Sequence, residues 1–541
     1  MLNLQEFPHE ILISIAEQLV RRIGIYKAVS LRSVNRAFNS AILHAICHSE
    51  VLSIDDCATP YLARRMAPTL KGRILLTRLR SKDVRNSTLL HVLATVNRAL
   101  DNATKPESQE QRIKQHQMIA EAVALKHRDQ TSQTQNQFRH IDAKVQAQNV
   151  FSGAIVLGNL QLVKELLQLR SPELVDENVE NPYFGRPLQI AATWGHLQIV
   201  EYLLACGANP RVCDDDQDWE SDREIYVGDP YIYRHSEGSP LRAAVLGGHE
   251  AIANLLLEPK HRISITSMEY VRAVVAGARN GHLHTLEKLI EPMKKSLSDM
   301  PRLQREILWE AACHDQIAIV KMVLDSGVDI DIAPLPDCFG HGCALSIAAS
   351  AGKAHMVQFL LDNGADANFS HLSQRKFDPI EIASHRGHEE VVDKLLERGA
   401  DSVRAFIHAT DRGQARLVNR LHTRDPSLHT KIWDWDYTAG FHALRQAIAT
   451  KNPDVIKLLV GIGVPLNEGY EYLDLPIITA KMYAAEWIVD LLLSLGAKDE
   501  ELNEENLFRR DEGYSEEDLS KQMVRGGVRI TKRTWEWVSK Y

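Results

Sequence analysis

The hydrophobic positions of residues 185–209 fall into two short blocks with helical spacing, in a stretch that reads GRPLQIAATWGHLQIVEYLLACGAN. Pro187 suits the first turn of a helix, where a missing N–H group costs nothing, and Gly195 marks the end of that helix. An apolar stripe at three- and four-residue steps follows, made of Leu197, Val200, Leu203 and Leu204. Gly207 stands where a left-handed helix cap is expected. The pattern predicts two short antiparallel helices, which must stack on similar pairs to bury both faces.

The same pattern recurs along the chain when the position of His196 is taken as a marker. The equivalent positions are Asn159, His249, His282, Gln316, Lys353, His388, Gln414, Asn452 and Ala485. Their spacing runs from 26 residues, between His388 and Gln414, to 53 residues, between His196 and His249. These spacings scatter around the period of about 33 residues that is typical of ankyrin repeats. The chain resembles ankyrin-repeat proteins, and the resemblance implies an all-α solenoid of stacked helix pairs.

The repeats differ from the family pattern at their first residues. The TPLH opening of an ankyrin repeat is replaced by RPLQ at Arg186, SPLR at Ser239 and DPIE at Asp378. This predicts an irregular stack, in which some repeats are held by packing more than by hydrogen bonds between repeats. We expect nine or ten helix pairs over residues 146–498, with Ala192 and Ala349 at close helix contacts.

Residues 1–48 have a different pattern. The segments FPHEIL and LRSVNRAFNSAI resemble an F-box, the helical module that docks a substrate receptor onto the Skp-type adaptor of a cullin–RING ubiquitin ligase. Phe7 and Phe38 stand where many members have Leu and Trp, and both are apolar and bulky. The resemblance implies that the adaptor-binding residues are Pro8, Ile11, Leu12, Ile15, Leu31, Val34 and Phe38.

Helical spacing supports two packed helices in residues 1–48, with apolar surface left over. Pro8 can open the first helix, and Ile11, Leu12 and Ile15 are predicted to share one of its faces. A second interpretation remains open, in which the two helices only cap the solenoid, because terminal units shield a repeat stack. The long interval between Cys47 and Asn159 argues against a cap, which should lie next to what it covers.

Residues 49–145 are predicted to form a helical and partly disordered connector. A basic stretch near its start could contact nucleic acid or a nuclear import receptor, or form a solvated helical face. It consists of Arg64, Arg65, Lys71, Arg73, Arg78, Arg80, Lys82 and Arg85. Residues 131–137 are predicted to be a loop or disordered, whereas residues 119–125 and 141–145 suit helices.

The widest interval between markers predicts an acidic insertion near residues 211–238. Insertions in ankyrin stacks fall in the finger loops between helix pairs, where partners bind. The candidate partner-binding residues are Asp214, Asp215, Asp216, Trp219, Tyr226, Tyr231 and Tyr233. Acidic residues interleaved with aromatic ones suit a basic peptide, and a solvated loop with no partner is the alternative. The loop lacks the Gly and Glu spacing of a calcium-binding EF-hand.

Composition limits the class of protein further. The chain has 541 residues, 44% hydrophobic and 25% charged residues and a formal charge of −8, which gives no reason to expect nucleic acid as its main partner. Its seven cysteines are an odd number and suit reduced thiols. Without a signal peptide or a membrane span of about 20 apolar residues, we expect a cytoplasmic or nuclear protein.

Motifs for chemistry are not expected. Cys338, His341 and Cys343 lie close together, but three ligands without a further Cys or His pair at site spacing do not make a zinc site. The sequence has no GxxxxGK[ST] loop, no GxSxG elbow and no HExxH pair. We therefore expect no catalytic residues, no metal and no cofactor. Residues 499–541, which include Trp535 and Trp537, are predicted to form a C-terminal cap or tail.

These expectations combine into one leading function. The chain would be a substrate receptor that contributes proximity, with the F-box-like module on the Skp-type adaptor and the ankyrin groove on an unidentified target protein. The alternative is an ankyrin-repeat interaction scaffold with no link to a ubiquitin ligase. An enzyme with an undetected site is a third class.

Overall fold

The computed structural model describes most of the helical part of the chain. The described residues are 9–30, 36–48, 68–79, 88–126, 143–170, 181–212, 238–332, 342–369, 378–434, 437–469, 475–483 and 486–500. They divide into two compact units, Met1–Ser296 and Leu297–Tyr541, each of which is described by itself.

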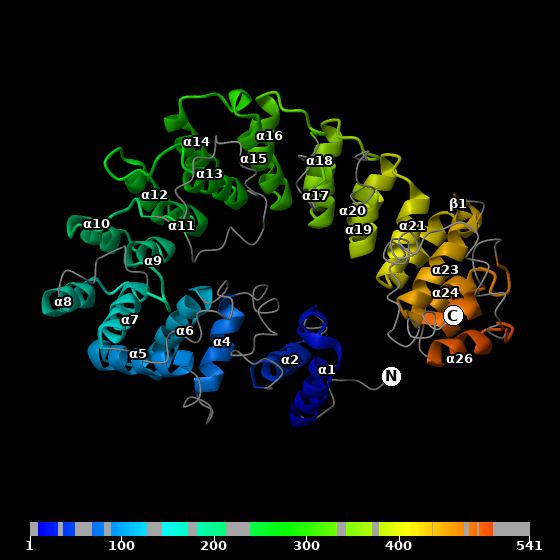
Figure 1. Ribbon diagram of the computed structural model, residues 1–541, viewed down its shortest axis with the longest axis horizontal. Coiled ribbons are helices and arrows are strands. Elements are labelled where there is room, and N and C mark those ends of the chain that lie inside the picture. The colour runs from blue at the N-terminus through cyan, green and yellow to red at the C-terminus, as the bar shows by residue number, and fades with distance from the viewer. Residues whose placement is uncertain are drawn as a thin grey trace, which may run out of the picture. The chain divides into compact units, whose positions relative to one another are not determined.

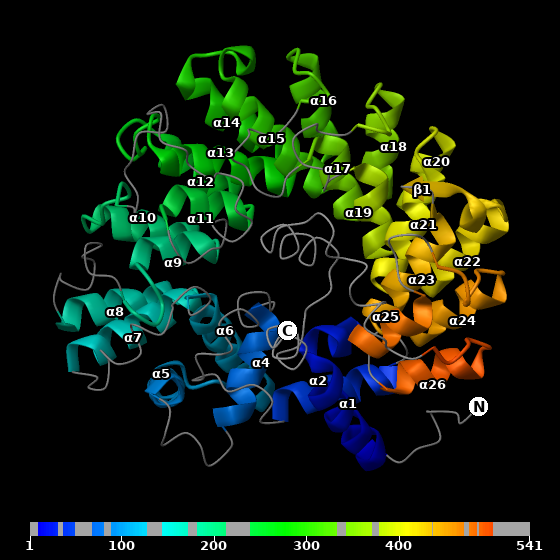
Figure 2. The same cartoon turned by 45° about the vertical axis from the view of Figure 1, so that its right-hand side comes forward.

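In the described residues of the first unit, four helix pairs follow residue 142. They are α7 (Ala143–Val156) with α8 (Leu160–Arg170), α9 (Pro187–Thr193) with α10 (Leu197–Ala205), α11 (Pro240–Gly247) with α12 (Glu250–Leu257), and α13 (Met268–Asn280) with α14 (Leu283–Ile290). We call the first helix of each pair inner and the second outer. Inner helices pack on inner helices and outer helices on outer ones, which gives the two layers in Figure 2. The short 3₁₀ helix η5 (Glu291–Met293) follows α14.

Among the described residues of the first unit, five helices precede these pairs. They are α1 (His9–Ser30), α2 (Arg36–His48), α4 (Pro68–Leu79), α5 (Thr88–Thr104) and α6 (Gln109–Lys126). α1 packs on α2, α2 on α4 and α4 on α6, whereas α5 and α6 both pack on α7 (Figure 1). At that contact a Cβ atom on Gly153 would come within 3.4 Å of side chains of α5 and α6. The helices that cover the first pair are therefore α5 and α6.

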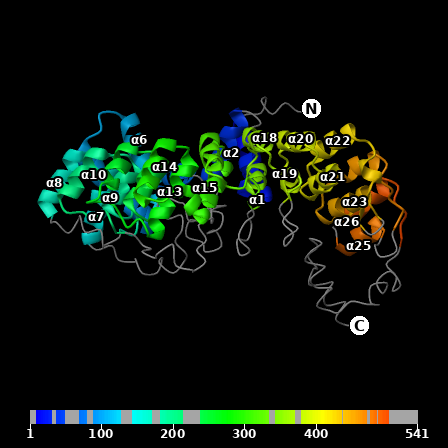
Figure 3. The same cartoon turned by 90° about the horizontal axis from the view of Figure 1, so that it is seen from above.

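The part of the second unit that the structure describes contains six helix pairs. They are α15 (Pro301–Cys313) with α16 (Ile317–Asp325), α17 (Ala344–Ser350) with α18 (Ala354–Asp362), α19 (Pro379–Arg386) with α20 (Glu389–Glu397), α21 (Ser402–Asp411) with α22 (Ala415–Arg424), α23 (Ala439–Ala449) with α24 (Pro453–Gly461), and α25 (Pro476–Tyr483) with α26 (Glu486–Ser494). Figure 3 shows their two layers, with α18, α20 and α22 in one row and α19, α21 and α23 in the other.

Short elements complete the second unit. The 3₁₀ helices η6 (Leu297–Asp299) and η7 (Leu428–Thr430) precede α15 and the β-hairpin. The hairpin itself consists of β1 (Ile432–Asp434) and β2 (Tyr437–Thr438), and in the described part of the chain it is the only two-stranded sheet. The described residues are thus mostly helical, as the sequence predicts.

The marker positions coincide with the starts of the outer helices. Nine markers directly precede an outer helix, and the tenth, Ala485, lies outside the described residues, although α26 begins at the next residue. Gly195 and Gly207 have positive φ angles of 77° and 96°, so they end α9 and α10 as the sequence predicts. Ala192 and Ala349 are fully buried.

Several expectations fall outside the described residues. These are the loop at residues 131–137, the greater part of the insertion at residues 211–238 and the C-terminal segment after Glu500. Residues 119–125 lie in α6, and α7 begins at Ala143. The domain limits at 48, 145 and 498 stay predictions.

Candidate protein-interaction site

Marker histidines tie neighbouring helix pairs together. In three junctions the imidazole Nε2 atom lies 3.1 Å from a backbone oxygen of the preceding pair: His196 on Val156, His249 on Thr193 and His388 on Ser350. Burial lowers the pKa of both His196 and His388, so their imidazoles are neutral at pH 7 and donate Nε2–H to the carbonyl oxygen. These histidines therefore hold neighbouring helix pairs together, as the repeat pattern predicts.

Each tie depends on a glycine in the preceding pair. A Cβ atom on Gly158, Gly195 or Gly352 would come within 2.8 Å of the imidazole that follows it in the stack. The same glycines have φ angles between 69° and 77°, which other residues rarely adopt. Glycine at this position satisfies two requirements at once, the left-handed backbone and the close approach of the imidazole.

The altered repeat openings carry buried ion pairs. The guanidinium of Arg242, in the SPLR opening, lies 2.8 Å from a carboxylate oxygen of Glu269 in α13, and the two side chains are 4% and 1% exposed. The same oxygen accepts the backbone N–H of Ser239 at 2.6 Å, and Arg272 lies 3.6 Å from the other carboxylate oxygen. The expectation that such repeats are held mainly by packing is wrong here, because charged side chains form hydrogen bonds between the pairs.

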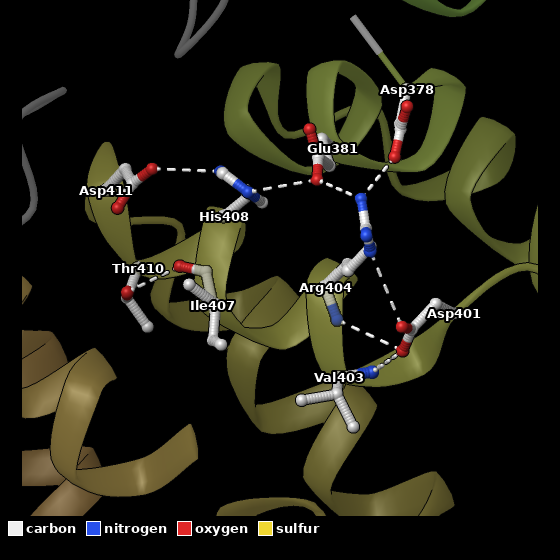
Figure 4. A network of polar contacts seen from close by, with 9 residues as sticks. All are labelled: Asp378, Glu381, Asp401, Val403, Arg404, Ile407, His408, Thr410 and Asp411. Carbon is white, nitrogen blue, oxygen red and sulfur yellow. Dashed lines mark hydrogen bonds and ion pairs between the residues drawn. The ribbon is translucent and has the colours of Figure 1, made fainter. Parts of the chain in front are cut away.

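A second network joins α19 and α21 at the DPIE opening (Figure 4). The Arg404 guanidinium pairs with the carboxylates of Asp378 and Glu381, and it lies 2.8 Å from Glu381 Oε1. Both acidic side chains are at most 10% exposed. Asp401 accepts the backbone N–H of Val403 at 2.8 Å, which caps α21 and places Arg404 in its first turn.

His408 adds a second cation to this network. Its Nδ1 atom lies 3.1 Å from Asp411 Oδ2, and its Nε2 atom lies 3.6 Å from Glu381 Oε1 (Figure 4). Burial alone would lower the pKa of His408, but hydrogen bonds to Asp411 and Glu381 and their charges raise it to about 9. At neutral pH two cations thus face the two buried carboxylates, Asp378 and Glu381. The network is suited to fixing α21 against α19.

Sequence reasoning missed this network, although a signal was present. The DPIE opening puts two acids where the family pattern has Thr and His, and Arg404 and His408 are four residues apart on the next inner helix. An acidic opening followed by a basic i, i+4 pair would have indicated an ion-pair junction.

The predicted adaptor-binding residues of α1 divide between two faces. Ile11 and Ile15 are 46% and 39% exposed, whereas Leu12, Ala16 and Val20 are at most 3% exposed. The expectation that Leu12 lies in one exposed stripe with Ile11 and Ile15 is therefore wrong, because Leu12 starts the i, i+4, i+8 row that faces the core.

The remaining predicted residues are not placed by the structure. Pro8, Leu31 and Val34 lie outside the described residues, and the side chain of Phe38 in α2 is not described. All seven candidates of the insertion lie outside as well: Asp214, Asp215, Asp216, Trp219, Tyr226, Tyr231 and Tyr233. Their binding roles stay predictions.

The described part of the chain contains neither a metal-binding cluster nor a membrane-spanning helix. Among these residues, no three His, Cys, Asp or Glu side chains are grouped so that they could hold a metal ion. Cys343 is fully buried at the start of α17, and Cys338 and His341 lie outside the described residues. No described helix is both long and apolar enough to cross a membrane.

Comparisons with known proteins identify the repeats. The family model described as "Ankyrin repeats (3 copies)" matches residues 151–269 and 335–405. The chain is 26% identical over 294 residues to the ankyrin repeat and KH domain-containing protein mask-1 of Caenorhabditis elegans, which covers 50% of this chain and 11% of that protein. It is 36% identical over 121 residues to the mouse ankyrin repeat, SAM and basic leucine zipper domain-containing protein 1, which covers 21% of this chain and 24% of that protein.

A solved structure of the human ASB11 ankyrin repeat domain aligns with 40% of this chain and 96% of its own, at 21% identity and a TM-score of 0.30. The chain thus spans no more than about a quarter of the two curated relatives. Helix pairs, histidine ties and the family match agree that residues 151–269 and 335–405 contain ankyrin repeats.

Proposed function

We propose that this chain is a substrate receptor of a cullin–RING ubiquitin ligase. In this proposal α1 and α2 form an F-box-like module that binds a Skp-type adaptor, and the ankyrin groove binds the protein to be ubiquitinated. The chain itself supplies proximity and no catalytic group. The proposal joins the sequence resemblance of residues 1–48 with the ankyrin repeats that follow.

The observation that carries the proposal is the exposed face of α1. Ile11 and Ile15 lie one helical turn apart and are 46% and 39% exposed, although Leu12 and Ala16 beside them are buried. Exposed neighbouring isoleucines are costly to leave in water, and they are typical of a surface that a partner covers. In the proposed complex the adaptor covers them.

The packing order supports a binding role over a capping role for α1 and α2. The first repeat pair is covered by α5 and α6, which pack on α7. α1 packs on α2, and α2 packs on α4. Because other helices already shield the first pair, the two N-terminal helices are available for a partner.

The test is co-purification of the full chain with a purified Skp-type adaptor. The double variant Ile11→Ala/Ile15→Ala should weaken adaptor binding at least tenfold, since truncating a buried interface anchor costs on the order of 1 to 2 kcal/mol or more. Ile113→Ala is the matched control, because Ile113 lies in α6 of the same unit and is 45% exposed. It should leave binding unchanged.

Leu12→Ala distinguishes folding from binding in the same experiment. Leu12 is 3% exposed, so its truncation should lower the thermal stability of the module by about 2 to 4 kcal/mol. The double variant should keep wild-type stability. If wild-type protein does not bind the adaptor at all, the ligase role is wrong.

A scaffold without a ligase is the second candidate function. The family match is confined to residues 151–269 and 335–405, which are repeats and need no ligase to bind proteins. If the chain is only a scaffold, it does not change how fast its bound partners are degraded. The half-life of a captured partner should then be the same with the wild-type chain and with Ile11→Ala/Ile15→Ala.

A further inference from the structure

In the second unit a β-hairpin lies in the connection between the α21–α22 pair and the α23–α24 pair. Both of its strands contact α23. β1 and β2 are antiparallel, with Ile432 opposite Thr438 and Asp434 opposite Tyr437, so Trp433 is opposite no residue of β2, as in a β-bulge. The hairpin is fixed at its base, because Ala439 N–H donates to Lys431 O at 2.8 Å and the Thr438 hydroxyl accepts the Phe441 N–H at 3.2 Å.

An aromatic row runs from the hairpin onto α23. The ring of His442 lies 6.2 Å from that of Trp433 and 5.8 Å from that of Tyr437, with which it stacks at 15°. Tyr437 in turn meets Phe441 edge-on at 6.4 Å, and Phe441 is fully buried. The bulge and the buried Phe441 hold the half-buried rings of Trp433, Tyr437 and His442 in place, so binding to them would need little ordering.

An aliphatic side chain stands beside this row. Ile432 is 69% exposed, the largest fraction among the exposed large hydrophobic residues of the described chain. The fold does not explain an exposed isoleucine on this short hairpin, because the hairpin is already anchored through Phe441 and Ala439.

The charges of the hairpin favour one kind of partner. Residues 431–438 read KIWDWDYT, with one basic and two acidic residues. The basic residue, Lys431, pairs with Asp425 at 2.7 Å, and its ammonium, together with Ser427, lowers the pKa of Asp425 to about 2. Asp434 and Asp436 give residues 431–438 a negative formal charge, although Asp436 lies outside the described residues. The faces of aromatic rings attract cations.

We infer that the hairpin anchors the target protein through a Lys or Arg side chain on the ring row of Trp433, Tyr437 and His442, with a neighbouring apolar residue on Ile432. The inference rests on the proposed function, because it names the chemistry of the target that the repeats bind. The partner is a protein segment, because its basic residue matches the rings and its apolar residue matches Ile432.

The test selects random 12-residue peptides from a phage library on the full chain, with enriched peptides then measured by fluorescence anisotropy. Enriched peptides should carry Arg or Lys beside an apolar residue. Replacing that Arg by citrulline, or that Lys by norleucine, removes the charge and should weaken binding about tenfold. Trp433→Ala and Asp436→Asn should each weaken binding severalfold, whereas Trp433→Phe should retain most of it.

Trp487→Ala is the matched control, because Trp487 lies in α26 of the same unit and is 47% exposed. It should change affinity less than twofold. The inference is wrong if no peptide enriches, if uncharged peptides bind equally well, or if Trp487→Ala weakens binding as much as Trp433→Ala. Circular dichroism of each variant reports its fold, and Asp436→Asn tests the charge without removing a ring.

Adaptor binding by the same preparations separates this inference from the proposed function. If the hairpin variants bind the adaptor normally but peptide selection shows no preference for basic residues, only the inference about the target fails. If basic peptides bind the hairpin and the adaptor does not bind the chain, the ligase role fails and the hairpin remains a protein-binding site.

Discussion

Single residues at the repeat junctions decide how closely neighbouring pairs meet. Gly352 and Gly364 both have positive φ angles, of 69° and 95°, but only Gly352 faces a neighbour. A Cβ atom there would come within 2.8 Å of the His388 imidazole, whereas nothing lies within 4 Å of one on Gly364. An alanine at Gly364 would therefore cost only the strain of the left-handed backbone, whereas an alanine at Gly352 would add a clash with the His388 imidazole.

Gly364→Ala should destabilise the protein by about 1 kcal/mol, the cost of a left-handed backbone at a residue with a Cβ atom. Gly352→Ala should cost at least about 1 kcal/mol more, because the imidazole must move and its bond to Ser350 is lost. Thermal unfolding of the two variants side by side measures the difference. Equal losses would mean that the His388 contact contributes nothing.

The pKa of His408 predicts a loss of stability in mild alkali. Its value in the folded protein, about 9, is above the 6.5 of an ordinary histidine, so the folded state binds the proton more tightly. The resulting stabilisation is complete below pH 6.5 and is lost as the pH rises through 9. This stabilisation should amount to roughly 2 kcal/mol after a reduction for partial exposure. The unfolding midpoint of the wild type should fall between pH 7 and pH 10, and His408→Gln should remove that fall.

His388 supplies the opposite control, since burial lowers its pKa. Its contribution is present above pH 6.5 and is lost as the pH falls below that value. A His388→Gln variant should therefore retain the alkaline loss and show less of the acidic one. If His408→Gln leaves the alkaline loss intact, another group causes it.

Between elements, the ion-pair network fixes α21 against α19. Asp378 and Glu381 are at most 10% exposed, and Arg404 is 39% exposed, so the acids are the more desolvated partners. Removing the guanidinium would take a cation away from both Asp378 and Glu381, two carboxylates that are largely shielded from water. Losing the charge partner of a desolvated carboxylate costs more than losing a surface pair.

Arg404→Met should lower stability by about 1 to 3 kcal/mol, a range reduced for the partial exposure of the arginine. Arg420→Met is the matched change on the outer layer, where Arg420 pairs with Asp393 and the two side chains are 53% and 24% exposed. That variant should lose less than about 1 kcal/mol. Chemical denaturation monitored by circular dichroism measures the free energy of unfolding of both variants. If the two variants lose similar amounts, the Arg404 network contributes no more than an ordinary surface ion pair.

The helix pairs could be predicted because their signals are local. The glycine, the marker residue after it and the apolar stripe that follows all lie within one repeat. Gly195, His196 and Leu197 therefore indicate where α10 starts. Asp315 and Lys451, with φ angles of 65° and 59°, occupy the glycine position without the glycine, and only the spacing located those repeats.

The junctions were harder to predict because they join residues far apart in the chain. Arg404 reaches back 26 residues to Asp378 and 23 residues to Glu381, and no single window contains both sides with their orientation. Leu12 shows the same limit at short range. The sequence spacing allows Ile11, Leu12 and Ile15 to share one apolar helix face. The packed helices show that Leu12 is buried in the core and that the two isoleucines are exposed.

At the scale of the whole molecule, the described pairs within each unit pack mainly on their sequence neighbours. α9 lies between α7 and α11, and α19 lies between α17 and α21. Stability in such an arrangement is a sum of local terms, so damage to one pair should spread only to adjacent pairs.

Ala192→Leu should therefore unfold locally. Ala192 is fully buried in α9, and a larger side chain there should cost about 1 to 3 kcal/mol. Hydrogen exchange should speed up in α7, α9 and α11 and stay at wild-type rates in α19 to α24. Ala205→Leu, at an exposed position of α10, is the control and should change neither. Faster exchange throughout the chain would contradict the local picture.

The two kinds of junction differ in what they demand of an adjacent repeat. His196, His249 and His388 bond to backbone carbonyl oxygens, which every residue possesses, so the preceding pair needs to keep only the glycine beside the imidazole. Arg242 with Glu269, and Arg404 with Asp378 and Glu381, require particular partners. During gene duplication and recombination, repeats joined by histidine ties are therefore exchangeable modules, whereas the repeats on either side of an ion-pair junction must be inherited together and in order.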